Sequence, residues 1–335
     1  MKPILELAMA CLLAMTAWTD GMGDDAKRMV TLGTVKTRAV SMGGAFTSVR
    51  DDLAALDFNP AAFTLDPYGG DAGIFVFLNP LGPWLAVKNR RLYSDPSVPI
   101  GLCLRGLGFS AGRIDAGVLL GEESLHGDWN LDRRDPFDAT GYETERNVDF
   151  GLSFALTQRA ALGVSGEMLL RRPDWRKAKL GYRYGLIVQP RTNFTVGLFY
   201  ADFPEGFNRE RADLESLADE TLNVGVSYKP WTFALLSFDI RNVSDEEQSS
   251  VREPHMGVEL VPFRHLALRG GYARTTDGKQ ETFSCGVGVL DLRSFLSAGR
   301  NSDRPFFGIQ SGWALQRFPF GRTQWFFLTC LVQIG

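Results

Sequence analysis

The 335-residue sequence has few of the residues on which catalytic and metal sites most often depend. It contains three histidines and four cysteines. Cys103, Cys285 and Cys330, the cysteines beyond the N-terminal region, are far apart and irregularly spaced, which excludes a disulfide framework and a cysteine-based metal motif. His255 and His265 flank one predicted hairpin, but no third ligand has metal spacing. We therefore predict no metal, no cofactor and no catalytic residue.

Long apolar runs and an excess of basic charge are also missing. Beyond the N-terminal region, no segment approaches the roughly 18 uninterrupted apolar residues of a transmembrane helix. The net charge of −3 provides no basic surface for nucleic acid. No repeat of fixed period is present, which excludes a propeller or solenoid. Because 44% of the residues are hydrophobic and 22% are charged, the chain is also not disordered.

One short motif has the pattern of a hydrolase. The stretch GFSAG at 108–112 matches G-x-S-x-G. A hydrolase elbow requires a strand, a tight turn and then a helix. Here the motif lies between two glycine-rich stretches that are typical of strands, so Ser110 is not predicted to be a nucleophile. We do not predict an enzyme.

The N-terminus is typical of an exported protein. Lys2 precedes a short apolar run from Ile4 to Trp18, and the sequence becomes abruptly polar at Asp20. This pattern predicts a cleaved signal peptide over 1–19. An exported chain without a transmembrane helix would be periplasmic, secreted or an outer-membrane barrel.

Alternating hydrophobicity predicts β-strands along most of the chain. In NVDFGLSFAL, from Asn147, every second residue is apolar, while Gly, Ser and charged residues occupy the opposite face. The links alternate as well. Short links at 157–160, 189–193, 229–232 and 262–265 are separated by long polar ones, of which 122–146 is the longest. This asymmetry is typical of outer-membrane barrels.

Counting these segments predicts an all-β fold, a transmembrane antiparallel barrel of roughly 14 strands. The predicted strands are 72–88, 100–110, 112–121, 147–156, 160–170, 179–188, 192–201, 221–228, 232–241, 255–261, 265–274, 281–290, 306–316 and 323–334. Pro80 and Pro83 make the first of them irregular, since proline cannot donate to a sheet ladder. The link 291–305 is long for the end at which the other links are short.

Charged residues in these strands are sorted to one face. Six of them lie opposite the apolar row of their strand, namely Asp149, Glu167, Arg183, Asp239, Glu259 and Arg269. A charge facing lipid at mid-depth costs about 2–4 kcal/mol for Arg. We therefore expect the six to face the lumen, where they pair or hold a plug. The alternative is a one-sided sheet with its charges in bulk water.

The segment before the first barrel strand is compact and rich in turns. Gly43 and Gly44 permit backbone conformations that other residues avoid. Asp51 and Asp52 could begin a short helix, DDLAALDF, which Asn59 ends because a residue before proline leaves the helical region. So small a unit cannot bury its own core. The lumen of the barrel is the available host.

This segment resembles the N-terminal signature of the FadL-like outer-membrane barrels, and in pattern the PorV/PorQ-type branch. The positions that match are Arg38, Ala39, Met42, Gly43, Gly44, Ala45, Phe46, Asp51, Asp52, Ala55, Asn59, Pro60 and Ala61. A second similar stretch runs from Leu235 to Arg274. The sequence departs from the pattern at Val35 and Ala62, where the family has glycine, and in its final LVQIG, which lacks an aromatic residue.

The resemblance implies a fourteen-stranded barrel in the bacterial outer membrane, with residues 20–70 as a hatch inside a barrel formed by 71–335. It further implies non-covalent binding or transport of a hydrophobic small molecule. The alternative that the resemblance leaves open is a PorV-like accessory barrel of type IX secretion, with secretion-machinery or client proteins as partners. In either case the barrel contacts outer-membrane lipid.

Overall fold

The computed structural model describes residues 26–32, 35–50, 54–64, 72–80, 82–83, 103–120, 125–128, 142–144, 146–170, 179–204, 220–243, 252–263, 266–275, 279–289 and 306–334. The predicted signal peptide, Asp51, Asp52 and the link 291–305 lie outside these residues. In the described part of the chain, no helix is long and apolar enough to cross a membrane.

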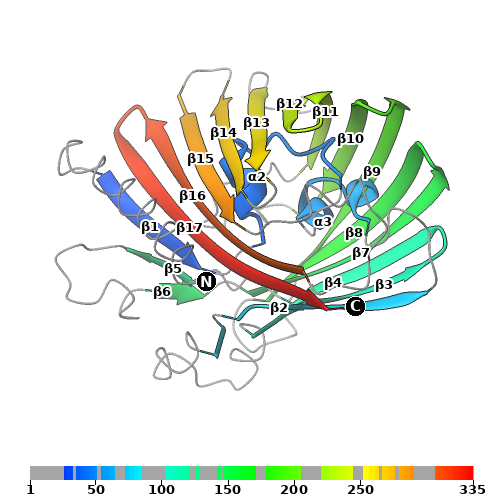
Figure 1. Cartoon of the computed structure of the whole chain (residues 1–335). Coiled ribbons are helices and arrows are strands. Elements are labelled where there is room, and N and C mark those ends of the chain that lie inside the picture. The colour runs from blue at the N-terminus through cyan, green and yellow to red at the C-terminus, as the bar shows by residue number, and fades with distance from the viewer. Residues whose placement is uncertain are drawn as a thin grey trace.

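The strands form one continuous sheet of 17, of which 14 close into an antiparallel barrel (Figure 1). The barrel strands are β2 (Gly73–Leu78), β3 (Leu104–Ala111), β4 (Ile114–Leu120), β7 (Arg146–Thr157), β8 (Ala160–Leu170), β9 (Lys179–Arg191), β10 (Phe194–Asp202), β11 (Glu220–Trp231), β12 (Ala234–Arg241), β13 (Glu253–Phe263), β14 (Leu266–Arg274), β15 (Glu281–Val289), β16 (Phe306–Phe318) and β17 (Gly321–Ile334). The predicted fold class is thus confirmed.

Sequential strands pair with one another, and β17 closes the ring by pairing with β2. The described closing pairs run from Val332 opposite Leu78 to Ile334 opposite Val76. Five hairpins, β3–β4, β7–β8, β9–β10, β11–β12 and β13–β14, have short links at one end of the barrel, which we call the turn end. The opposite end, the loop end, has the long links predicted from the sequence.

The two faces of the wall follow the alternation of the sequence. Apolar side chains of alternate residues are exposed on the outside, among them Phe150, Leu152, Leu198, Leu236 and Leu268. We call this exterior surface the apolar belt. The residues between them point inward and are mostly small or polar. An apolar exterior and a polar interior are the arrangement of an outer-membrane barrel, in which lipid takes the place of water outside.

Three strands were not predicted. β1 (Ala26–Leu32) lies parallel to β17, with Ala26 opposite Arg322 and Leu32 opposite Leu328. β5 (Leu125–Asp128) pairs with β1 and with β6 (Tyr142–Thr144). β5 and β6 are too short for a period-2 pattern to emerge. β1 begins with Ala26, Lys27 and Arg28, which do not alternate, and it gains its register from the edge of β17. These strands lie beside β17 at one side of the barrel (Figure 1).

The segments 35–50 and 54–64 lie inside the barrel, and we call them the hatch. The hatch contains α2 (Thr37–Ser41), α3 (Ala55–Phe58) and the 3-10 helix η1 (Pro60–Ala62). Figure 1 shows α2 and α3 surrounded by the strands of the wall. Gly43 and Gly44 have φ of 66° and 72°, in the left-handed region that glycine tolerates. Asn59 is extended, with φ −167° and ψ 102°, and ends α3.

Candidate functional site

The hatch rests on a ring of glycines in the wall. Five pairs of inward glycines lie directly opposite each other on neighbouring strands: Gly117 and Gly151, Gly163 and Gly185, Gly197 and Gly225, Gly257 and Gly271, and Gly286 and Gly312. A Cβ at any of the ten would come closer than 3.0 Å to an atom of the hatch. The hatch therefore approaches the backbone of the wall itself, and we call this ring the glycine seat.

The contact between hatch and wall is tightest at β13 and β14, where Met42 and Gly43 lie against the wall backbone. A Cβ at Gly257 would lie 2.6 Å from the Met42 carbonyl oxygen. A Cβ at Gly43 would lie 2.6 Å from the backbone nitrogen of Tyr272. Glycine is therefore present on both sides of this contact, at Gly43 in the hatch and at Gly257 and Gly271 in the wall. Met42 itself is fully buried, against Phe46 and other apolar hatch residues.

A first charged cluster joins the hatch to β7, β8 and β9. Arg183 forms ion pairs with Asp149 (2.8 Å), with Glu167 and with Asp57 of the hatch (3.1 Å). Lys36 of the hatch binds the other Asp57 oxygen at 3.1 Å. All five side chains are buried. Buried charges need partners to offset their desolvation, and here the partners belong to both parts of the protein.

Three carboxylates of this cluster lie close enough together to suggest a cation site. Carboxylate oxygens of Asp57, Asp149 and Glu167 lie within 4.8 Å of one another. The guanidinium of Arg183 makes an ion pair with each of them, so a positive group already occupies the centre. We therefore assign the cluster to hatch attachment and not to metal binding.

A second cluster holds the hatch to β13 and β14. Arg38 of the hatch donates two hydrogen bonds to the Glu259 carboxylate, from Nε and Nη2, each 2.8 Å long. Arg269 donates from Nε to the same carboxylate at 2.7 Å. Paired bonds of this kind fix geometry as well as charge. Since Glu259 and Arg269 are direct neighbours across the hairpin, the wall provides a preformed partner for Arg38.

A third group of wall residues binds the backbone of the hatch. Asp239 accepts a hydrogen bond of 2.8 Å from the Thr47 amide. His255 Nδ1 lies 2.5 Å from the Gly43 carbonyl oxygen, to which it donates. Arg241 donates to the carbonyl oxygen of Gly44. These contacts satisfy the polar groups of a turn that has no secondary structure of its own.

Asn59 is the central polar residue of the hatch. Its Nδ2 donates to the Thr47 carbonyl at 2.7 Å, and to the carbonyls of Leu186 and Leu198 in the wall at 3.3 Å each. Its Oδ1 accepts from the Ala61 amide at 3.0 Å. Pro60 begins η1 directly after it. One buried side chain therefore joins two parts of the hatch to two strands.

We expect Asn59→Ala to loosen the hatch. Each buried group left without a partner costs about 1–3 kcal/mol, and Ala removes a donor and an acceptor together. Hydrogen exchange at hatch amides should become faster, while exchange in the wall strands is unchanged. Asn59→Asp keeps the acceptor for Ala61 but turns a buried carboxylate oxygen toward three carbonyl oxygens, so its hatch amides should exchange at least as fast as those of Asn59→Ala. Equal exchange in all three proteins would contradict this role.

All six predicted lumen charges lie on the inward face of their strands and are buried. The structure brings Asp149, Glu167 and Arg183 together, brings Glu259 and Arg269 together, and places Asp239 apart from both groups. Of the matched hatch positions, all but Asp51 and Asp52 are among the described residues. Arg38, Met42, Gly43, Gly44, Asn59, Pro60 and Ala61 contact the wall or the rest of the hatch.

Several residues of the site were not predicted from the sequence. Arg241 shares the inward face of β12 with Asp239, two residues away, so the alternation contained a signal for it. No signal in the sequence indicates that His255 binds the hatch. Lys36 and Asp57 lie in the hatch, where no periodic pattern indicates which way a side chain points. Ser110 is followed by a tight turn into β4, as a strand-to-strand hairpin requires.

Comparison with known proteins gives matches among solved structures only. No family model matches the chain, and no curated protein matches it. The toluene transporter TodX of Pseudomonas putida is 13% identical, with a TM-score of 0.47 over 90% of this chain and 97% of its own. A FadL homologue of Pseudomonas aeruginosa is 13% identical, with a TM-score of 0.43 over 92% and 98%.

The monoaromatic hydrocarbon channel CymD is 11% identical, with a TM-score of 0.48 over 90% of this chain and 97% of its own. At these identities and TM-scores, the likeness does not transfer a function to this chain. The comparisons give no support for the PorV/PorQ branch.

Proposed function

We propose that this chain is a protein of the bacterial outer membrane that binds or transports hydrophobic small molecules past its hatch, without covalent chemistry. The observation that carries the proposal is an apolar sector of the lumen. Wall residues Phe75, Phe77, Leu119, Ala161 and Ile187 are buried there in one cluster with hatch residues Val35, Ala55, Leu56, Ala61, Ala62 and Phe63.

This sector distinguishes the barrel from an open porin. A porin lumen is polar and filled with water. Here aromatic and aliphatic side chains of β2, β4, β8 and β9 face inward and meet the apolar face of α3 and η1. An apolar solute meets compatible surface along this side, whereas a hydrated solute would lose its water there. The charged clusters hold the hatch in place at other points of the same wall.

Locking the hatch is expected to stop uptake. The hydroxyls of Thr37 in α2 and Thr329 in β17 lie 2.6 Å apart, so Thr37→Cys with Thr329→Cys can form a disulfide. In a background without the native cysteines, the oxidised pair should lower uptake of toluene or oleate by whole cells to the level of cells lacking the barrel. A reductant should restore it. The single cysteine variants are the controls.

Two results would contradict the proposal. If cells with the wild-type barrel take up neither probe faster than cells without it, the transport role fails. If the oxidised lock transports as well as the reduced form, passage does not involve movement of the hatch. For the alternative, a PorV-like accessory barrel of protein secretion, the described residues provide no specific observation.

A further inference from the structure

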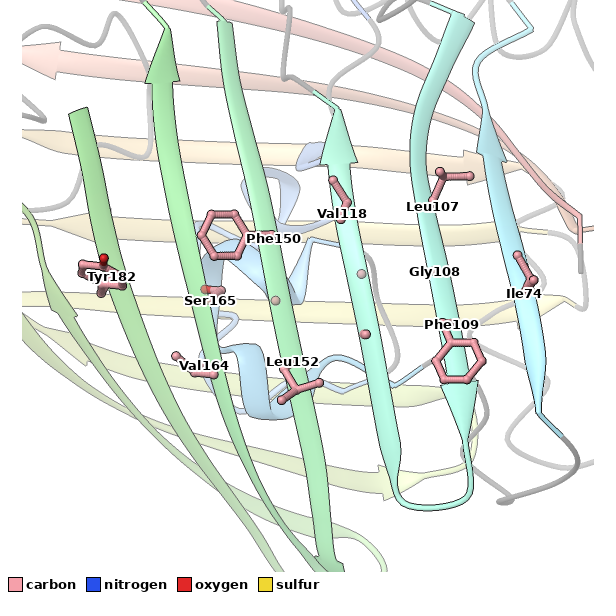
Figure 2. A pocket seen from close by; sticks show the side chains of 13 residues that line it. Ile74, Leu107, Gly108, Phe109, Val118, Phe150, Leu152, Val164, Ser165 and Tyr182 are labelled. Carbon is pink, nitrogen blue, oxygen red and sulfur yellow. The ribbon is translucent and has the colours of Figure 1, made fainter. Parts of the chain in front are cut away.

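A groove crosses the membrane-facing side of the wall. It has a volume of about 530 Å³, and its 13 lining residues come from β2, β3, β4, β7, β8 and β9. Figure 2 shows the outward side chains of Ile74, Leu107, Phe109, Phe150, Leu152 and Tyr182 around it, with the hatch behind the strands. The volume lies in the range of roughly 300–1,000 Å³ found for small-molecule sites. The groove is on the outside of the barrel, and Gly117 and Gly151 of the glycine seat separate it from the hatch.

Two rows of outward side chains form its sides. One row contains Leu107, Val118 and Phe150, which are direct neighbours on β3, β4 and β7. The second row contains Phe109, Ala116, Leu152 and Val164, in register on β3, β4, β7 and β8. The rows are two residues apart along the strands, or about 7 Å. Ala116 has the smallest side chain of either row and leaves the centre of the groove open.

The floor of the groove is bare backbone. Between the two rows lie Gly108, Gly117 and Gly151, which are in register and face inward. A Cβ at Gly117 would be 2.7 Å from the Phe63 ring of the hatch, and one at Gly151 would strike Leu56. The wall is therefore thin here and rests on the apolar face of the hatch, which gives the floor a rigid backing.

The chemistry of the lining selects hydrocarbon. None of the 13 lining residues is charged, and the side-chain hydroxyls are those of Ser165 and Tyr182. Ser165 faces inward and donates to the Leu56 carbonyl oxygen at 3.0 Å, so it is not available to an outside ligand. Tyr182, 44% exposed, offers its hydroxyl at the β9 end. A ligand therefore finds one long apolar surface with a single polar group at one end.

The position of the groove identifies its occupant. It is continuous with the apolar belt, which faces the hydrocarbon of the bilayer. Its lining spans six adjacent strands, or five spacings of about 4.8 Å, which is roughly 24 Å. One leaflet of a bilayer core about 30 Å thick has chains reaching roughly 15 Å, so one chain fits. We propose that this groove binds an acyl chain of a membrane phospholipid, with Tyr182 toward its polar end.

The test is retention of lipid by the full-length protein. Wild type, Ala116→Phe and Cys285→Phe are purified in mild detergent, incubated with palmitoyl-oleoyl phosphatidylethanolamine and weighed by native mass spectrometry. Ala116→Phe fills the groove from outside without reaching the hatch. Cys285→Phe makes a comparable change on the outward face of β15, away from the groove. We expect wild type and Cys285→Phe to retain the phospholipid equally and Ala116→Phe to retain several-fold less.

Other outcomes overturn the inference. Equal retention by wild type and Ala116→Phe means that the groove does not bind the chain, and equal loss in Cys285→Phe means that the effect is general to the belt. A dimer that Ala116→Phe abolishes would assign the groove to a second copy. If Ala116→Phe does not fold, as judged by heat-modifiable migration on gels, Val118→Phe narrows the groove from the other row and decides by the same comparison. The inference rests on the proposed membrane location of the barrel and is independent of the proposed transport role.

Discussion

Gly271→Val is expected to displace the hatch and open the barrel to ions. The Cβ of any larger residue there would overlap the backbone between Met42 and Gly43. Backbone cannot move aside as the end of a flexible side chain can, so the hatch must shift. Overpacking of this kind costs about 1–3 kcal/mol. In planar bilayers the variant should show open-channel conductance that the wild type lacks.

The neighbouring glycine provides a matched control. Gly270 lies one residue earlier in β14 and faces outward, where an added Cβ would meet only a Val258 methyl at 3.5 Å. Gly270→Val therefore makes the same chemical change on the lipid side and should leave conductance unchanged. If both valine variants conduct, the strand is disturbed in general; if neither conducts, the hatch is not fixed by its contact with Gly271.

The alternation of the sequence was sufficient to predict the strands of the wall. Asp149, Glu167 and Arg183 could be assigned to the lumen because each lies opposite an apolar row. Their mutual contact follows from register, since Asp149 is opposite Glu167, and Ser165, two residues before Glu167, is opposite Arg183. A tight hairpin with a bulge between Ala155 and Thr157 sets the register of β7 and β8, whereas β9 follows β8 through a long link. Neither register can be counted from the sequence, so the cluster could be assembled only from the structure.

The role of the glycine seat could not be predicted from the sequence, for a different reason. The sequence places glycines opposite the apolar rows, but a glycine in a strand has many explanations, including weak packing or a bulge. Its reason here is the close approach of another part of the chain. Gly257 and Gly271 are explained only when Met42 and Gly43 are placed against them. The alternation within one strand does not indicate which hatch residues its glycines will contact.

Replacing Arg183 by Met is expected to cause the largest loss of stability. The guanidinium makes ion pairs with Asp57, Asp149 and Glu167, all buried. Removing one partner of a buried pair costs about 3–5 kcal/mol because the remaining charge is uncompensated. Urea unfolding of the refolded barrel in detergent, followed by its heat-modifiable migration on gels, should show a lower midpoint. Arg191→Met, at an exposed arginine of the same strand, should leave the midpoint unchanged.

A compensating variant separates charge from shape. Arg183→Met combined with Asp149→Asn and Glu167→Gln removes the two wall carboxylates together with their partner, while Asp57 keeps its ion pair with Lys36. Because the loss arises from uncompensated charge, this triple variant should recover most of it. Arg183→Lys should remain intermediate, since a single ammonium cannot reproduce the guanidinium fork that reaches three carboxylates. If the triple variant is as unstable as Arg183→Met, the charge account is wrong. The guanidinium then stabilises the protein through its shape and its packing over Phe203, whose ring centre is 5.4 Å away.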